Sequence, residues 1–203
     1  MVQRRSFIPA FSLPLGVYDL ELGEDFNSDL ITFIDSLRQD TGNAQRSSVG
    51  GWRNEGNFFA QQNEAVQTLR RACIDVALGY LQECAANLPP EGRAEIFGWA
   101  NWNGKGHFNT PHRHPGWDVC GCYYVRQPDA TDMKSGSIEF LDHRNIPKKQ
   151  LRLGGPVYSQ SIELRPKPGE LVVFPPMVSH WVPPNQGDDP RVVIAWNLNL
   201  ENK

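Results

Sequence analysis

The chain has no excess of basic charge, no long apolar run and few cysteines. Its 203 residues carry 20 lysines and arginines against 23 aspartates and glutamates, which gives a formal net charge of −3. Nucleic acids and anionic membranes are bound by basic faces, so we expect neither as a partner. No apolar run approaches the roughly 18 residues that cross a bilayer. The N-terminal MVQRRSFIPAF has no apolar core of the signal-peptide kind, so we expect a cytoplasmic protein.

The four cysteines form no Cys-x-x-Cys pair. Cys73 and Cys84 occupy apolar positions of a predicted helix, so we expect reduced, buried thiols there. Cys120 and Cys122 are two residues apart on a predicted strand and so face the same way. A zinc site that combines them with nearby histidines is an alternative, although structural zinc sites usually have longer ligand spacings.

The first half of the chain predicts two helices. Apolar residues recur at helical spacing in 25–40 and again in 63–88, where two prolines follow. Residues 41–57 between them are polar and rich in Gly and Ser, which predicts a loop near the mouth of a site. Residues 1–93 carry no functional motif, and we expect them to form an N-terminal extension with supporting helices.

Residues 94–203 have a different sequence pattern, in which short β-rich segments alternate with turn residues. Seven or eight strands are expected there, which is typical of a sandwich or jelly roll. We therefore predict a mainly β fold with flanking helices, the N-terminal helices packing on one sheet. The whole chain, 1–203, is expected to be a single domain with 94–203 as its core.

Three of the five histidines stand where a metal site would need them. Residues two apart on a strand project from one face, so His112 and His114 can lie side by side. His180 follows another apolar strand and a Pro-Pro pair. A metal site is one explanation of the pair, and surface histidines at a turn are the other.

Arg191 begins the apolar segment RVVIAWNLNL. A guanidinium at the edge of a buried strand needs a partner, because an unpaired buried charge is very costly. The partner is either an anionic ligand, held by a bidentate pair, or an acidic side chain of the protein itself.

The second half contains the motifs Gly-x-x-Asn-x-x-His-x-His, Cys-Tyr-Tyr-Val, Ser-Gly-Ser-Ile-Glu-Phe, Pro-Gly-Glu-Leu-Val-Val-Phe-Pro and His-x10-Arg. In this order and spacing they resemble those of the Fe(II)/2-oxoglutarate-dependent oxygenases, in particular the prolyl-hydroxylase-like branch and its bacterial relatives. The resemblance covers about Trp99 to Asn199 and implies a double-stranded β-helix, a cupin-like jelly roll whose open end holds the metal.

The resemblance also implies roles for single residues. Iron would be held by His112, His114 and His180. The far carboxylate of the cosubstrate 2-oxoglutarate would be bound by Arg191, with help from Tyr124. A further cosubstrate contact is implied at one of three neighbouring positions, Asn101, Trp102 or Asn103.

One position departs from the family pattern, which usually has an Asp where this chain has His114. Three neutral imidazoles leave Fe(II) with its full 2+ charge, so dianionic 2-oxoglutarate would give a neutral complex. Alternatively, Asp118 or Asp142 supplies a carboxylate and one histidine is not a ligand. We favour the three-histidine set because His112 and His114 are two residues apart, and side chains at this spacing on a strand project from the same face. The thiols of Cys120 and Cys122 would risk oxidation if they faced the iron, so we expect them turned into the core.

We therefore expect a non-haem Fe(II)/2-oxoglutarate-dependent dioxygenase that hydroxylates a small-molecule or peptide substrate with dioxygen. The sequence does not reveal the substrate, the oligomeric state or the physiological metal, since imidazole also suits zinc, nickel and copper. Two other functions stay open. One is a three-histidine cupin-type metalloenzyme that does not use 2-oxoglutarate, and the other is a non-catalytic jelly-roll binding module with a closed metal site.

Overall fold

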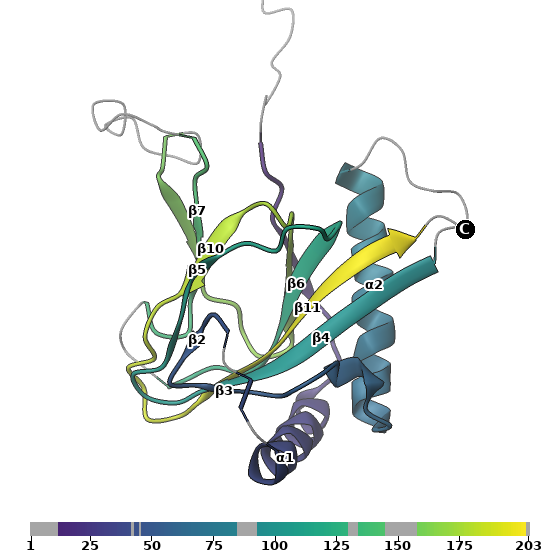
Figure 1. The fold of residues 1–203 in the computed structure, drawn as a ribbon, viewed down its shortest axis with the longest axis vertical. Helices are drawn as coiled ribbons and strands as arrows, with labels where there is room; N and C mark the ends of the chain where they lie inside the picture. Colours follow the sequence, from purple (N-terminus) through teal and green to yellow (C-terminus); the bar gives the residue numbers. More distant parts are fainter. Residues whose placement is uncertain are drawn as a thin grey trace, which may run out of the picture.

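The fold is that of a computed structural model, in which two antiparallel sheets face each other and helices cover the outer face of one of them (Figure 1). The prediction of a mainly β jelly roll with N-terminal helices on one sheet is confirmed. The structure describes residues 12–41, 43–44, 46–84, 93–129, 134–144 and 158–201.

The larger sheet has, in the described residues, six strands in the order β1-β9-β6-β11-β4-β3. Its two longest strands, β4 and β11, pair along their whole length and lie next to each other. In chain order, the strands are Gly16–Asp19 (β1), Trp52–Arg53 (β3), Arg93–Asn103 (β4), Val119–Arg126 (β6), Glu170–Phe174 (β9) and Arg191–Glu201 (β11).

The smaller sheet has, again within the described residues, five strands in the order β2-β5-β10-β7-β8. Strand β10 lies at its centre and pairs with β5 on one side and β7 on the other. In chain order, these strands are Ser48–Val49 (β2), Phe108–His112 (β5), Ile138–Leu141 (β7), Ser161–Leu164 (β8) and Ser179–Val182 (β10).

Helices α1 (Glu24–Asp40) and α2 (Glu64–Cys84) confirm the two predicted helices, and a short 3-10 helix, η1 (Phe58–Ala60), precedes α2. The apolar face of α1 packs on β6, and α2 packs on β4, β6 and β9. The described residues contain these two α-helices, and neither is long and apolar enough to cross a membrane.

Cys73 is buried as predicted. Cys84 is exposed in the last turn of α2, where the helix no longer contacts the core, so its prediction as a buried thiol is wrong.

The central strands of the larger sheet are buried on both faces. In β6, Tyr123 packs toward the helices, whereas Cys122 and Tyr124 pack toward the smaller sheet. Side chains alternate in the same way along β4 and β11, so one sheet contributes to two apolar cores. This double burial explains why β6 reads as the continuous apolar run VCGCYYV rather than as an alternating pattern.

Residues 41–57 were predicted to be a loop, but they contain the two-residue strands β2 and β3. Strand β2 extends the smaller sheet beside β5, and β3 extends the larger sheet beside β4. The side chain of Asn43 holds the turn between them, because its Nδ2 donates to the carbonyl of Gly51 and its Oδ1 accepts from the N–H of Arg53. The segment therefore closes one edge of the sandwich.

Gly121 in β6 is required by its neighbour across the sheet. The indole of Trp196, which is fully buried in β11, lies over the glycine. A Cβ atom at position 121 would stand 2.3 Å from Cζ2 of Trp196, much closer than van der Waals contact.

Gly121→Ala should therefore destabilise the protein. Inserting a methyl group into a packed core typically costs about 1–3 kcal/mol, and we expect a loss of that size in the free energy of unfolding from urea denaturation. Gly79→Ala is the matched control, since a Cβ there meets nothing within 4 Å and Ala favours the helix. Equal stability of Gly121→Ala and the wild type would contradict the packing described here.

Candidate functional site

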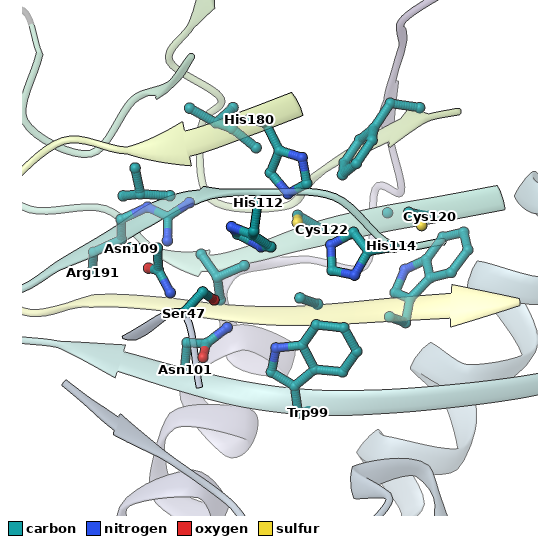
Figure 2. Close-up of a pocket in the computed structure, with 17 residues that line it drawn as sticks. Ser47, Trp99, Asn101, Asn109, His112, His114, Cys120, Cys122, His180 and Arg191 are labelled. Atoms are coloured by element: carbon teal, nitrogen blue, oxygen red, sulfur yellow. The ribbon is translucent and has the colours of Figure 1, made fainter. Parts of the chain in front are cut away.

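Three histidines from the smaller sheet converge on one point (Figure 2). His112 ends β5, His180 lies in β10, and the antiparallel register places them opposite each other. His114 follows two residues after β5, and its backbone N–H donates to the carbonyl of Pro176 at 3.0 Å. The potential ligand nitrogens of the three rings all lie within 4.8 Å of one another. The predicted pair and the distant third histidine are thus brought together.

Hydrogen bonds set the tautomer of two of these rings. Nδ1 of His112 lies 2.7 Å from the carbonyl oxygen of Thr110, and Nδ1 of His180 lies 3.0 Å from that of Val178. A carbonyl oxygen only accepts, so Nδ1 carries the proton in both rings. Nε2 then has a free lone pair, which is the arrangement found in metal-binding histidines.

The third ring contacts a buried amide. Nδ2 of Asn197 lies 3.4 Å from Nδ1 of His114, and Oδ1 of Asn197 is buried without a hydrogen-bond partner in the described residues. A half-turn of the amide would exchange these two atoms. Oδ1 would then accept from Nδ1–H of His114, and the His114 ring would also present a free Nε2.

All three rings are neutral at physiological pH. Burial, followed by the neighbouring His112, lowers the pKa of His180 to about 3 and that of His114 to about 4. Burial also lowers the pKa of His112. Metal binding needs the neutral imidazole, so the fold keeps the three rings in the required state without any metal.

Arg191, at the start of β11, is only 3% exposed. Its Nη2 donates to Oη of Tyr124 at 3.2 Å, and its Nε donates to the carbonyl of Gly136 at 3.4 Å. Burial raises the pKa of Tyr124, so its hydroxyl stays protonated. No aspartate or glutamate of the described residues pairs with this guanidinium. Of the two partners that the sequence left open, an anionic ligand is therefore the one that the structure favours.

The three histidines and Arg191 line one pocket between the two sheets. Its cavity volume is about 30 Å³. In Figure 2, Arg191 lies on the side of His112 away from His114. No acidic side chain is among the described residues that line the pocket. Besides the histidines and Arg191, the polar residues that line it include Asn101, Asn109 and Ser47.

The three positions predicted for a further cosubstrate contact end up in different places. Asn101 lines the pocket. Asn103 points to the same side and is fully buried, where its Nδ2 donates to Oδ1 of Asn109 and its own Oδ1 has no partner in the described residues. Trp102 faces the helices on the other side of β4, under the guanidinium of Arg38, so it cannot contact the pocket.

The two carboxylates considered as alternative ligands lie elsewhere. Oδ2 of Asp118 accepts from the backbone N–H of Leu200, and Asp142 forms an ion pair with Arg144. Among the described residues, neither is grouped with the histidines as a potential ligand. The structure therefore gives no support to a carboxylate in the ligand set.

Cys120 and Cys122 are buried in an apolar core, as predicted, but this core lies on the side of β6 that faces the site. Both line the pocket, because β6 has a core on each face and its even-numbered residues face the smaller sheet. Burial raises the pKa of the Cys122 thiol to about 11, and also raises that of Cys120. Among the described residues, neither thiol is grouped with the histidines as a potential metal ligand, which argues against a mixed cysteine and histidine zinc site.

One residue beside the site was missed by the sequence analysis. Arg53 is 8% exposed and places its guanidinium over the ring of Trp99, 4.3 Å from the ring centroid. Its burial depends on the pairing of β3 with β4, and nothing in the polar segment around it predicts that pairing.

Comparisons with known proteins agree with this geometry. The profile of a protein family described as "Putative 2OG-Fe(II) oxygenase" matches residues 98–197. No curated protein matches the sequence.

Solved structures share the fold at low sequence identity. A prolyl-4-hydroxylase of Pseudomonas putida is 15% identical, with a TM-score of 0.66 over 93% of this chain and 92% of that chain. A Trichoplax adhaerens prolyl hydroxylase, in complex with a peptide fragment of hypoxia inducible factor, is 14% identical, with a TM-score of 0.64 over 91% and 83%. HygX from Streptomyces hygroscopicus, with nickel, 2-oxoglutarate and hygromycin B bound, is 12% identical, with a TM-score of 0.61 over 91% and 82%.

The depressed histidine pKa values predict an acid-sensitive apoprotein. A histidine in the unfolded chain titrates near pH ~6.5, so below that pH the unfolded chain binds protons that the folded chain excludes. The free energy of unfolding of the metal-free protein should fall from pH 7 to pH 5, by about 1.4 kcal/mol per pH unit for each excluded proton. Urea denaturation at a series of pH values measures this slope.

His180→Gln should flatten the slope, because glutamine does not titrate. His143→Gln, which removes an exposed histidine outside the pocket, is the matched control. A wild-type stability that is constant between pH 7 and pH 5 would show that the fold does not hold these rings neutral.

Proposed function

We propose that this chain, which belongs to the superfamily of Fe(II)- and 2-oxoglutarate-dependent oxygenases, holds iron on His112, His114 and His180 and 2-oxoglutarate on Arg191 and Tyr124. One observation carries the proposal. A single pocket contains three neutral imidazoles with converging nitrogens and a buried guanidinium that no acid of the described residues neutralises.

The donor set fits a divalent transition metal. Imidazole nitrogen binds iron as well as zinc, nickel and copper, so the ligands alone do not select the metal. The superfamily supports iron. Three protein ligands on one side leave further coordination positions free, which an enzyme needs and a closed structural site lacks.

The charges of the pocket fit a dianionic cosubstrate. Fe(II) on three neutral rings keeps a 2+ charge, and Arg191 adds one positive charge. The described lining residues supply no negative charge. A carboxylate against Arg191 can form a bidentate pair, and charge-assisted hydrogen bonds of this kind are the strong ones.

When bound, iron and 2-oxoglutarate supply the oxidation, in which 2-oxoglutarate is decarboxylated to succinate with dioxygen while a substrate C–H is hydroxylated. The protein supplies position and environment. Arg191 and the Tyr124 hydroxyl fix the far end of the cosubstrate. Buried apolar side chains such as Phe174 and Val193 keep water from the pocket wall.

The finer features of the protein are part of the same proposal. The substrate is a small molecule or a peptide, and relatives with bound hygromycin B and with a bound peptide represent both kinds. Residues 1–93 support the core at 94–203 within a single domain. The cytoplasmic location remains a prediction from the sequence, as does dioxygen as the oxidant.

Anaerobic titration with Fe(II) and then 2-oxoglutarate tests the assignment. The wild type should develop the weak visible charge-transfer band of the iron chelate. His180→Ala should lose the band, because it removes an iron ligand. Arg191→Gln should retain iron but need roughly tenfold to a hundredfold more 2-oxoglutarate, since it loses charge-assisted hydrogen bonds.

Asp118→Asn is the matched control and should keep both the band and the affinity for 2-oxoglutarate. Loss of iron binding in Asp118→Asn would support the alternative in which Asp118 is an iron ligand. Iron binding without the band in the wild type would favour a cupin-type metalloenzyme that does not use 2-oxoglutarate. Failure to bind any metal would favour the remaining alternative, a non-catalytic jelly-roll binding module.

The amide of Asn197 should control the third ligand. Asn197→Leu removes the partner of His114 Nδ1, and losses of metal affinity of about 10–100-fold follow the removal of such partners. Asn197→Asp should retain the affinity, because a carboxylate accepts from Nδ1–H. Competition with a chelator measures the affinity for Fe(II).

Asn199→Leu is the control for this experiment. Asn199 lies on the same strand, where its Nδ2 donates to the carbonyl of Gly116. Its replacement should leave the affinity for iron unchanged. Wild-type affinity in Asn197→Leu would show that the amide does not orient His114.

A further inference from the structure

Arg53 lies on the pocket side of the larger sheet. In the antiparallel pairing of β3 with β4, Arg53 is opposite Asn101, so the two side chains share a face. Asn101 and Trp99 both line the pocket, and the guanidinium of Arg53 lies over the Trp99 ring. Trp99 also lies beside the candidate metal site, because the centroids of the Trp99 and His114 rings are 5.8 Å apart.

The charge of Arg53 has no partner in the described part of the chain. No acid lies within ion-pair distance, and the ring of Trp99 is the contact made by its guanidinium there. Burial and the nearby Arg46 lower the pKa of Arg53 to about 10, so it still carries its charge at neutral pH. A charge that is nine-tenths buried is costly unless something compensates it.

A second arginine that lies over a tryptophan of β4 provides a comparison. Arg38 in α1 lies over the ring of Trp102 on the opposite face of β4, 5.0 Å from its centroid. That side chain is partly exposed and forms an ion pair with Asp35 at 2.7 Å. The two arginine–tryptophan contacts are thus alike in geometry. The contact on the pocket side is the one that lacks a counter-ion among the described residues.

The net charge of the pocket with iron and 2-oxoglutarate bound also favours an anionic ligand near Arg53. Iron and Arg191 together carry three positive charges, and 2-oxoglutarate brings two negative ones. One positive charge remains, and Arg53 adds another. The described lining residues include no acid, so a further anionic ligand would balance this charge.

We propose that Arg53 binds an anionic oxygen group of the substrate, a carboxylate or a phosphate, at the edge of the pocket beside Trp99. The inference rests on the proposed function, because it assigns Arg191 to the cosubstrate and Arg53 to the substrate. The planar fork of the guanidinium suits both anions, and its stacking on Trp99 fixes its orientation. The same positive charges would disfavour cationic substrates.

Two pairs of probes test the proposal on protein loaded anaerobically with Fe(II) and 2-oxoglutarate. N-acetylglycine is compared with its neutral amide, N-acetylglycinamide, and methyl phosphate with neutral trimethyl phosphate. Binding is followed by calorimetry and by the change in the visible band. At least one anion should bind the wild type roughly tenfold more tightly than its neutral counterpart, the usual worth of one charge-assisted hydrogen bond. The pair that shows the preference identifies the anion.

Variants assign the preference to its residue. Arg53→Gln should abolish it, Arg53→Lys should retain part of it, and Arg38→Gln should retain all of it. The affinity for 2-oxoglutarate should be unchanged in the three variants. The lysine variant keeps the test valid if Arg53→Gln does not fold.

Three results would overturn the proposal. They are equal binding of anions and neutral counterparts to the wild type, a preference that survives in Arg53→Gln, and a loss of affinity for 2-oxoglutarate in that variant. Failure of the proposed function gives a different result, since the wild type itself would then form no visible band. The calorimetric comparison is in that case made on the metal-free protein, where a preference lost in Arg53→Gln still supports the anion site.

Discussion

The pairing of β5 with β10 is the contact on which the site depends. It places His180 opposite His112, although 67 positions separate them along the chain, and it places the segment after β5 where His114 can join them. The carbonyls of Thr110 and Val178, on the same two segments, then set the tautomer of the neighbouring rings. One pairing thus determines the distance between the nitrogens, the position of their protons and their burial.

Burial has opposite consequences for the two kinds of basic group in the pocket. It lowers the pKa of the imidazoles until they are neutral at physiological pH, which prepares them to bind a metal. A guanidinium titrates so high that it stays charged even when it is buried, as Arg53 shows. The pocket therefore combines neutral imidazoles that could hold a metal with fixed positive charges, an arrangement that favours anionic ligands.

The larger sheet supports the site because both of its faces are buried. Its outer face packs on α1 and α2, and this core includes Trp196 over Gly121. Its inner face carries Arg191, Tyr124 and Asn197 toward the histidines. The helices of the first half thus support this sheet by packing on its outer face. Rigid elements keep ligands and their partners in place better than loops do.

The sequence by itself determined the elements with strong local patterns and the residues with unusual chemistry. The helical spacing in α1 and α2, the His-x-His motif and a lone arginine before an apolar strand were all readable, because each is a property of a few neighbouring residues. The tertiary structure alone decided that Asn101 rather than Trp102 faces the pocket, that Cys120 and Cys122 line it, and that Arg53 is buried beside it. Alternation along a strand shows which residues share a face. When both faces are apolar, only the pairing of distant strands decides which face encloses the site.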